Sequence, residues 1–177
     1  LKDRSRYGLS LVLGAAEVKL LDMVSAFGVF SQDGVRREYT GILKVEDGNG
    51  RILEEYKEQS QRVIDEQAAR EINDILSDNN ARAPMFGLYS PLSLGPIPAA
   101  AKTGTTQDPN DETKARDAWI IGYTPSLVAG VWVGNSDNTP MQQKGSGVLA
   151  AAPAWRAFME FVFSSTPPEQ FSPPSPY

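Results

Sequence analysis

Histidine and cysteine are both absent from the 177 residues of this chain. Without them the chain cannot form a Ser-His-Asp triad, a cysteine nucleophile, a thiolate metal site or an imidazole proton relay. Catalytic chemistry must therefore come from lysine, hydroxyl groups, carboxylates or backbone dipoles, and we expect neither a metal nor another cofactor. The lack of cysteine is compatible with an oxidising compartment but does not establish one.

Positive charge is also scarce. Lys and Arg number 17 against 22 Asp and Glu, which gives a net charge of -5, and no basic run concentrates positive charge. We therefore expect no nucleic acid partner. No apolar run reaches the roughly 18 to 20 residues of a membrane span, and the first residues do not form a signal peptide. Because the chain does not begin with Met, we expect it to be part of a longer protein.

Three stretches place apolar residues at helical spacing. The pattern predicts a helix over residues 16–30, a second from a cap at Asp65 to residue 76, and a third over residues 155–162. In the third, Trp155, Phe158, Met159 and Val162 fall on one face, which we expect to pack on a sheet.

Other stretches favour extended structure. Residues 35–45 and 51–56 flank the turn-forming segment 46–50 and predict an exposed hairpin. Three further strands are expected over residues 99–105, 118–123 and 127–134. We expect loops over residues 81–98, where Pro84 is the first of four prolines, and over the polar stretch 107–116, which we interpret as mobile. The predicted class is α/β (α+β), an antiparallel sheet flanked by helices.

The end of the chain is rich in proline. Five prolines follow Phe163 within a few residues, which excludes a helix or a central strand there. We therefore divide the chain into a domain portion at residues 1–163 and a linker or disordered tail at residues 164–177.

The strongest chemical signal is a strand of small residues that carries Lys102-Thr103-Gly104, followed by Thr105 and Thr106. Small side chains let a substrate backbone lie against a strand edge, and one lysine among several hydroxyls can hold an anion. The tripeptide alone also fits an ordinary strand end. A phosphate-binding loop is excluded because Ala101 precedes the lysine where that motif needs glycine, and prolines occupy the preceding loop.

Several further segments, in order, resemble the later part of the transpeptidase domain of class A, bifunctional penicillin-binding proteins. The similarity runs from about Leu13 to Phe163. The matching segments are Leu13–Val18, Ile42–Asp47, Lys102–Thr106, Asp117–Pro125 and Val131–Asn135. This resemblance implies the fold shared by penicillin-binding proteins and serine β-lactamases, here incomplete. It also implies a cell-wall enzyme on the extracytoplasmic face of the bacterial membrane.

The resemblance assigns roles to the strand. Lys102 would complete the polar network of the catalytic serines, and the Thr103 and Thr105 hydroxyls would bind the terminal carboxylate of a D-Ala-D-Ala stem peptide. The Thr105 N–H would form half of the oxyanion hole. Gly104 would keep the strand edge clear, and Thr106 would support it. The implied partners are the peptidoglycan stem peptide, β-lactams and the missing N-terminal portion of the domain.

The other two motifs of that family are not found. No serine has a lysine three positions later, so the nucleophile of the SxxK motif is not in this chain. Ser77-Asp78-Asn79 and Ser136-Asp137-Asn138 imitate the SxN motif, but both follow the segment that SxN precedes in the family. We interpret them as helix-end and turn residues. The chain alone is therefore expected to bind without acylating.

Other conspicuous residues have plainer interpretations. Trp119 and Trp132 lie among apolar neighbours on predicted strands, so we expect core packing. Glu54-Glu55 and the acidic stretch 108–112 are expected to be solvated surface. A noncatalytic module that keeps the penicillin-binding fold for peptide binding or as a scaffold stays open as the alternative. In either case the fragment should expose apolar surface and associate with the missing portion or with itself.

Overall fold

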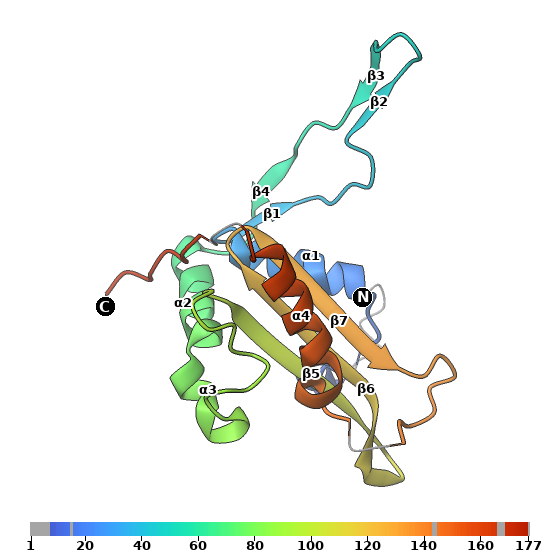
Figure 1. Cartoon of the computed structure of the whole chain (residues 1–177), viewed down its shortest axis with the longest axis vertical. Helices are drawn as coiled ribbons and strands as arrows, with labels where there is room; N and C mark the ends of the chain where they lie inside the picture. The colour runs from blue at the N-terminus through green and yellow to red at the C-terminus, as the bar shows by residue number, and fades with distance from the viewer. Residues whose placement is uncertain (1–7, 15, 143–144, 166–168, 177) are drawn as a thin grey trace.

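The computed structural model describes residues 8–14, 16–142, 145–165 and 169–176, and Figure 1 shows their arrangement. The helices are η2 (Leu9–Leu13), α1 (Leu20–Ser31), α2 (Glu66–Ser77), α3 (Asn79–Phe86), η3 (Gly147–Ala151) and α4 (Ala152–Val162). The strands are β1 (Val35–Arg37), β2 (Lys44–Glu46), β3 (Ile52–Glu55), β4 (Ser60–Arg62), β5 (Ala100–Asp108), β6 (Asp111–Thr124) and β7 (Leu127–Gly134). The predicted class, an antiparallel sheet flanked by helices, is confirmed.

The main sheet has the order β5-β6-β7, and both pairings are antiparallel. α4 covers one face, where Trp155 and Met159 are fully buried beside Ile120. α1 covers part of the other face, and the ring of its Phe27 lies 6.1 Å from that of Tyr123. The central strand β6 is therefore buried on both sides over its C-terminal half, where Ala118 to Thr124 read as a nearly continuous apolar run (Figure 1).

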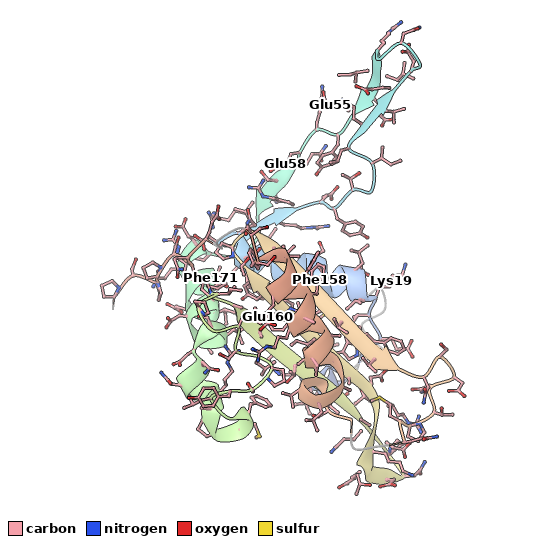
Figure 2. All side chains as sticks on the ribbon, in the orientation of Figure 1. Lys19, Glu55, Glu58, Phe158, Glu160 and Phe171 are labelled. Atoms are coloured by element: carbon pink, nitrogen blue, oxygen red, sulfur yellow. The ribbon has the colours of Figure 1, made fainter. Side chains whose placement is uncertain are left out.

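The final helix was predicted correctly, but its apolar face is only partly buried. Trp155 and Met159 are completely buried, while Phe158 is 48% exposed. Figure 2 labels Phe158 on α4. α1 begins four residues later than predicted, because Lys19 is extended and serves as the N-cap. It ends as expected, since Asp33 and Gly34 both adopt positive φ, 50° and 91°.

A projecting arm leaves the body after α1. β1 pairs with β4 at its base and β2 pairs with β3 at its tip, and all of β2, β3 and β4 is exposed (Figure 1). The tip turn is held by Asp47, whose carboxylate accepts the N–H groups of Asn49 and Arg51 at 2.9 and 3.0 Å. The predicted exposed hairpin is confirmed.

The helix after Asp65 has the expected cap, but the loop predicted beyond residue 80 begins with another helix. The Asp65 carboxylate accepts the N–H groups of Gln67 and Ala68. Asp78 then caps α3 in the same way, so the polar stretch that ends α2 also starts α3. Pro84 lies inside α3, and the prediction of a loop at this proline was wrong. Inside a helix a proline removes one N–H donor and costs about 3 kcal/mol, and the Asp78 cap offsets part of that cost.

The predicted mobile loop over residues 107–116 was also wrong, because β5 and β6 continue and pair as far as Asp108 and Asp111. Asp108 makes the tight turn possible. Its carboxylate accepts the N–H groups of Asn110 and Asp111 at 2.8 and 3.1 Å and pairs with Arg116 at 2.9 Å. Asp108 is only 4% exposed, so it is not the solvated residue that the sequence suggested. The polar composition of residues 107–116 therefore led to the prediction of a loop where the structure has a β-hairpin.

A buried polar contact joins three elements beside the sheet. The Tyr123 hydroxyl donates to Oδ1 of Asn73 on α2 at 2.8 Å, and Nδ2 of Asn73 donates to the Phe30 carbonyl oxygen on α1 at 2.9 Å. Both side chains are completely buried, and burial raises the pKa of the Tyr123 hydroxyl. The Tyr123 hydroxyl and both polar atoms of the Asn73 side chain therefore each have a hydrogen-bond partner within the core.

The substitution Tyr123→Phe should lower the free energy of unfolding by about 1 to 3 kcal/mol, because Oδ1 of Asn73 would stay buried without a donor. Thermal or urea unfolding of the protein measures the loss. Tyr89→Phe is the matched control, since Tyr89 is 96% exposed, and it should unfold like the unsubstituted protein. Equal effects of the two substitutions would contradict the role of the buried contact.

Asp108 should contribute to the acid sensitivity of the protein. The Asn110 N–H and the Arg116 guanidinium hold the pKa of Asp108 below its ordinary value of 3.8. Its contribution to stability is present above the ordinary pKa of 3.8 and is lost as pH falls below that value, through the lower folded pKa. Asp108→Asn should flatten the dependence of unfolding on pH in that range. An unchanged dependence on pH in the Asp108→Asn protein would contradict this contribution.

Candidate functional site

Strand β5, which carries Lys102, is an edge strand of the three-stranded main sheet (Figure 1). In its register with β6, Lys102 lies opposite Ile121, and Gly104 lies opposite Trp119. Successive side chains of a strand point to opposite faces. Lys102 and Gly104 therefore share the face that α1 partly covers, and the two threonines between and after them share the α4 face.

On the α4 face, η3 lies directly against the strand. The Gly147 N–H donates to the Thr105 hydroxyl oxygen at 3.0 Å. A Cβ atom at residue 147 would stand 2.4 Å from the Trp119 carbonyl oxygen and 2.8 Å from that of Gly104. Only glycine allows this approach. The sequence prediction missed Gly147, although a glycine directly before an alanine-rich run was a usable signal.

On the opposite face the lysine is open to solvent. Lys102 is exposed, and its Nζ donates to the Thr103 carbonyl oxygen at 2.6 Å. Within the described ranges, no carboxylate lies within ion-pair distance of this ammonium group. The strand edge thus presents a cation whose charge is available to an anionic group.

The two tryptophans lie in one row across the sheet on the lysine face. Gly104, Trp119 and Trp132 occupy matching positions on β5, β6 and β7. Trp132 is 38% exposed and its indole N–H donates to Asp117 at 2.8 Å, so core packing was the wrong prediction for it. Trp119 is half-buried. α1 begins at Leu20, whose side chain lies beside Gly130 in the neighbouring row, and among the described residues the tryptophan row is only partly covered.

Neither imitation of the SxN motif belongs to this edge. Ser77 ends α2, and its hydroxyl donates to the Asp74 carbonyl oxygen at 3.3 Å. In the second stretch Asp137 accepts the amide and the hydroxyl of Thr139, which hold the pKa of Asp137 below its ordinary value. Their interpretation as helix-end and turn residues is confirmed.

The acidic residues do not form a second site. Glu54 and Glu55 lie exposed on β3, as predicted. In the part of the chain that the structure describes, no three carboxylates gather closely enough to hold a metal ion. The described helices also include none long and apolar enough to cross a membrane.

Solved structures with a similar fold include penicillin-binding proteins. The structure resembles PonA1, a penicillin-binding protein of Mycobacterium tuberculosis, with a TM-score of 0.80 and 25% identity over 94% of this chain and 44% of PonA1. A structure of PonA1 in complex with penicillin V matches with a TM-score of 0.77, 28% identity and the same coverage. Penicillin-binding protein 1A of Haemophilus influenzae also gives 0.77, at 25% identity, over 97% of this chain and 30% of its own.

Sequence similarity assigns the family. Residues 5–160 match the penicillin binding protein transpeptidase domain. Penicillin-binding protein 1A of Aquifex aeolicus is 34% identical over 93% of this chain, and that of Mycolicibacterium smegmatis is 33% identical over the same share. The chain belongs to the penicillin-binding protein transpeptidase domain family. It spans about a fifth of the length of these curated relatives, 21% in both cases, which agrees with the predicted part of a class A protein.

The first residue of η3, Gly147, can be tested directly. Gly147→Ala should destabilise the protein by about 1 to 3 kcal/mol, because the new methyl group would push η3 away from two carbonyl oxygens. Gly41→Ala is the matched control, since a Cβ atom there meets nothing within 4 Å. Chemical unfolding measures both variants. A Gly147→Ala protein as stable as the control would show that η3 does not depend on this approach.

Proposed function

We propose that this chain is the substrate-binding edge of a serine D,D-transpeptidase that cross-links peptidoglycan stem peptides through an acyl-enzyme. The observation that carries the proposal is the exposed, unpaired ammonium of Lys102 beside the threonines of an edge strand, in a chain of this family. An open strand edge with a cation suits an extended peptide that ends in a carboxylate. The structure of PonA1 in complex with penicillin V supports β-lactams as a class of ligand for this chain.

The hydroxyl of Thr105 is suited to the carboxylate. Its oxygen already accepts the Gly147 N–H, so its own hydrogen stays free to donate. Thr103 projects to the same face and would add a second donor, while Lys102 would act from the opposite face as a point charge. The Thr105 N–H would contribute one half of the oxyanion hole, where negative charge develops during acyl transfer. Gly104 would keep the edge unobstructed, and Thr106 would support it.

The nucleophile must come from outside this chain. No serine here has a lysine three positions later, and the second oxyanion donor in the family is the amide of that serine. The partly covered tryptophan row and the apolar residues of η2 support association with a further portion of the domain, since Leu9, Val12 and Leu13 are each at least 89% exposed. Because Lys102 faces the same side as the tryptophan row, the nucleophile-bearing portion would cover both. The isolated chain would bind weakly and acylate nothing.

The setting of the parent protein follows from the reaction. Stem peptides with D-Ala-D-Ala ends are cross-linked outside the cytoplasm, so we place the parent protein at the extracytoplasmic face of the bacterial membrane. The lack of the nucleophile also favours a second candidate, a noncatalytic module that keeps the fold to bind peptide. The sequence encoded before Leu1 separates the two, because only the enzyme needs SxxK and SxN motifs there.

Labelled penicillin should acylate the parent protein, and Lys102→Ala should slow acylation on the order of 100-fold, because the variant lacks the charge that acts at the transition state. Lys114→Ala is the matched control, since Lys114 lies on the neighbouring strand and pairs with Asp111. Its rate should stay close to that of the unsubstituted protein. A parent that carries the serine motif but takes no label would contradict the enzyme, and so would equal rates of the two variants.

A further inference from the structure

Residues 169–176 follow the end of the family match at residue 160, yet they lie against the domain. They form neither helix nor strand. Pro173, Pro174 and Pro176 fix most of their backbone near the polyproline II region, so this segment loses little conformational entropy when it docks. We call residues 169–176 the tail strap. In Figure 1 it runs beside α2, and Figure 2 labels its Phe171.

The first anchor of the tail strap is aromatic. The ring of Phe171 packs edge-on against that of Tyr123, with centroids 5.7 Å apart and an interplanar angle of 86°. Tyr123 is completely buried and also contacts Phe27 on α1. Phe171 therefore covers the aromatic residue that ties the central strand to α2 through Asn73.

The second anchor is a pair of hydrogen bonds to the main chain of Ser175, and its side chain takes no part in them. On α2, the Gln67 amide donates from Nε2 to the Ser175 carbonyl oxygen at 3.0 Å and accepts the Ser175 N–H at Oε1 at 2.8 Å. This reciprocal pair resembles one step of a β-ladder. It requires a residue with an N–H at position 175, and serine stands there between two prolines that lack one.

Around the first anchor the strap does not pack continuously. A hollow of about 300 Å³ remains between residues 169–172 and the end of α1, lined there by Ser31, Gln32 and Asp33 and closed by Pro125. The Gln32 side chain donates to the Pro125 carbonyl oxygen at 2.7 Å and so fixes the wall of this hollow. Binding thus rests on two separate points, one aromatic ring and one backbone amide four residues later.

We propose that the surface formed by Tyr123, Gln67 and the end of α1 is a recognition site for an extended Phe-x-Pro-Pro-Ser peptide, which this chain occupies with its own tail strap. The occupant is the segment already seated there. Docking connects β6 to α2, and α2 packs beside the lysine-bearing strand β5, so the strap braces the side of the sheet that carries the candidate site. The proposal does not depend on acylation.

Hydrogen exchange of the full-length parent protein tests the site. The Ser175 amide should be protected, and Phe171→Ala should speed exchange over residues 169–176 on the order of tenfold by removing the aromatic anchor. Gln67→Ala should act in the same direction, because it leaves the Ser175 N–H without an acceptor. Phe161→Ala is the matched control, as Phe161 is 78% exposed, and it should change nothing.

A peptide of residues 169–177 then distinguishes recognition from general loosening. Loss of the strap in the Phe171→Ala protein should also speed exchange at the first turn of α2, where Gln67 binds Ser175. Added to that protein, the peptide should restore slow exchange at this turn, while the same peptide with alanine for phenylalanine should not. Unprotected exchange at Ser175 in the unsubstituted protein, or no rescue by the peptide, would overturn the proposal. Protection that rises with protein concentration would also overturn it, because the strap would then belong to a second copy.

Discussion

The indole of Trp155 lies against the main chain of Gly122, near the C-terminal end of the central strand β6. Its N–H donates to the Gly122 carbonyl oxygen at 3.3 Å, and a Cβ atom at residue 122 would stand 2.2 Å from the ring. This approach seats α4 on one face of the sheet. Because β6 is then covered on that face, its opposite side chains, Tyr123 among them, must find partners on α1 and α2. The close approach of Trp155 to Gly122 thus sets how tightly α4 packs on β6.

The geometry of the candidate site on β5 also depends on the central strand β6. β5 pairs with β6 over nearly its whole length, so the positions of the lysine and the threonines are set by a strand whose own faces are fixed. Gly147 then holds η3 against the threonine side. At Lys102 itself the described residues leave the lysine side exposed, so its ammonium group lies in water. Electrostatic interaction there is weak until a further portion of protein excludes solvent.

Much of this arrangement could be predicted from local patterns, and the failures share a physical cause. The helix at Asp65 and the strands of the main sheet follow from a cap and from apolar runs. Pro84 and the stretch 107–116 were misassigned because carboxylates supplied by Asp78 and Asp108 stabilise backbone that composition alone assigns to loops. Trp132 was misassigned because residue type does not say how far α1 extends over the sheet. The docking of Phe171 depends on a partner 48 positions earlier, which no local pattern reveals.

Two features lie on the lysine face of the sheet. The tryptophan row is only partly covered, and the proposed site there lacks a nucleophile. Burial of Trp119 and Trp132 requires a cover beyond the start of α1, and an acyl-transfer reaction requires a serine near Lys102, on the same face. One inserted portion of protein can meet both needs. Its apolar contacts with the tryptophans would exclude the water that now surrounds the lysine, and exclusion of water strengthens the attraction between the ammonium and a bound carboxylate. For the proposed transpeptidase, the apolar cover and the reactive group would then be one requirement, and the edge strand would act in acyl transfer only when the sheet face beside it is closed.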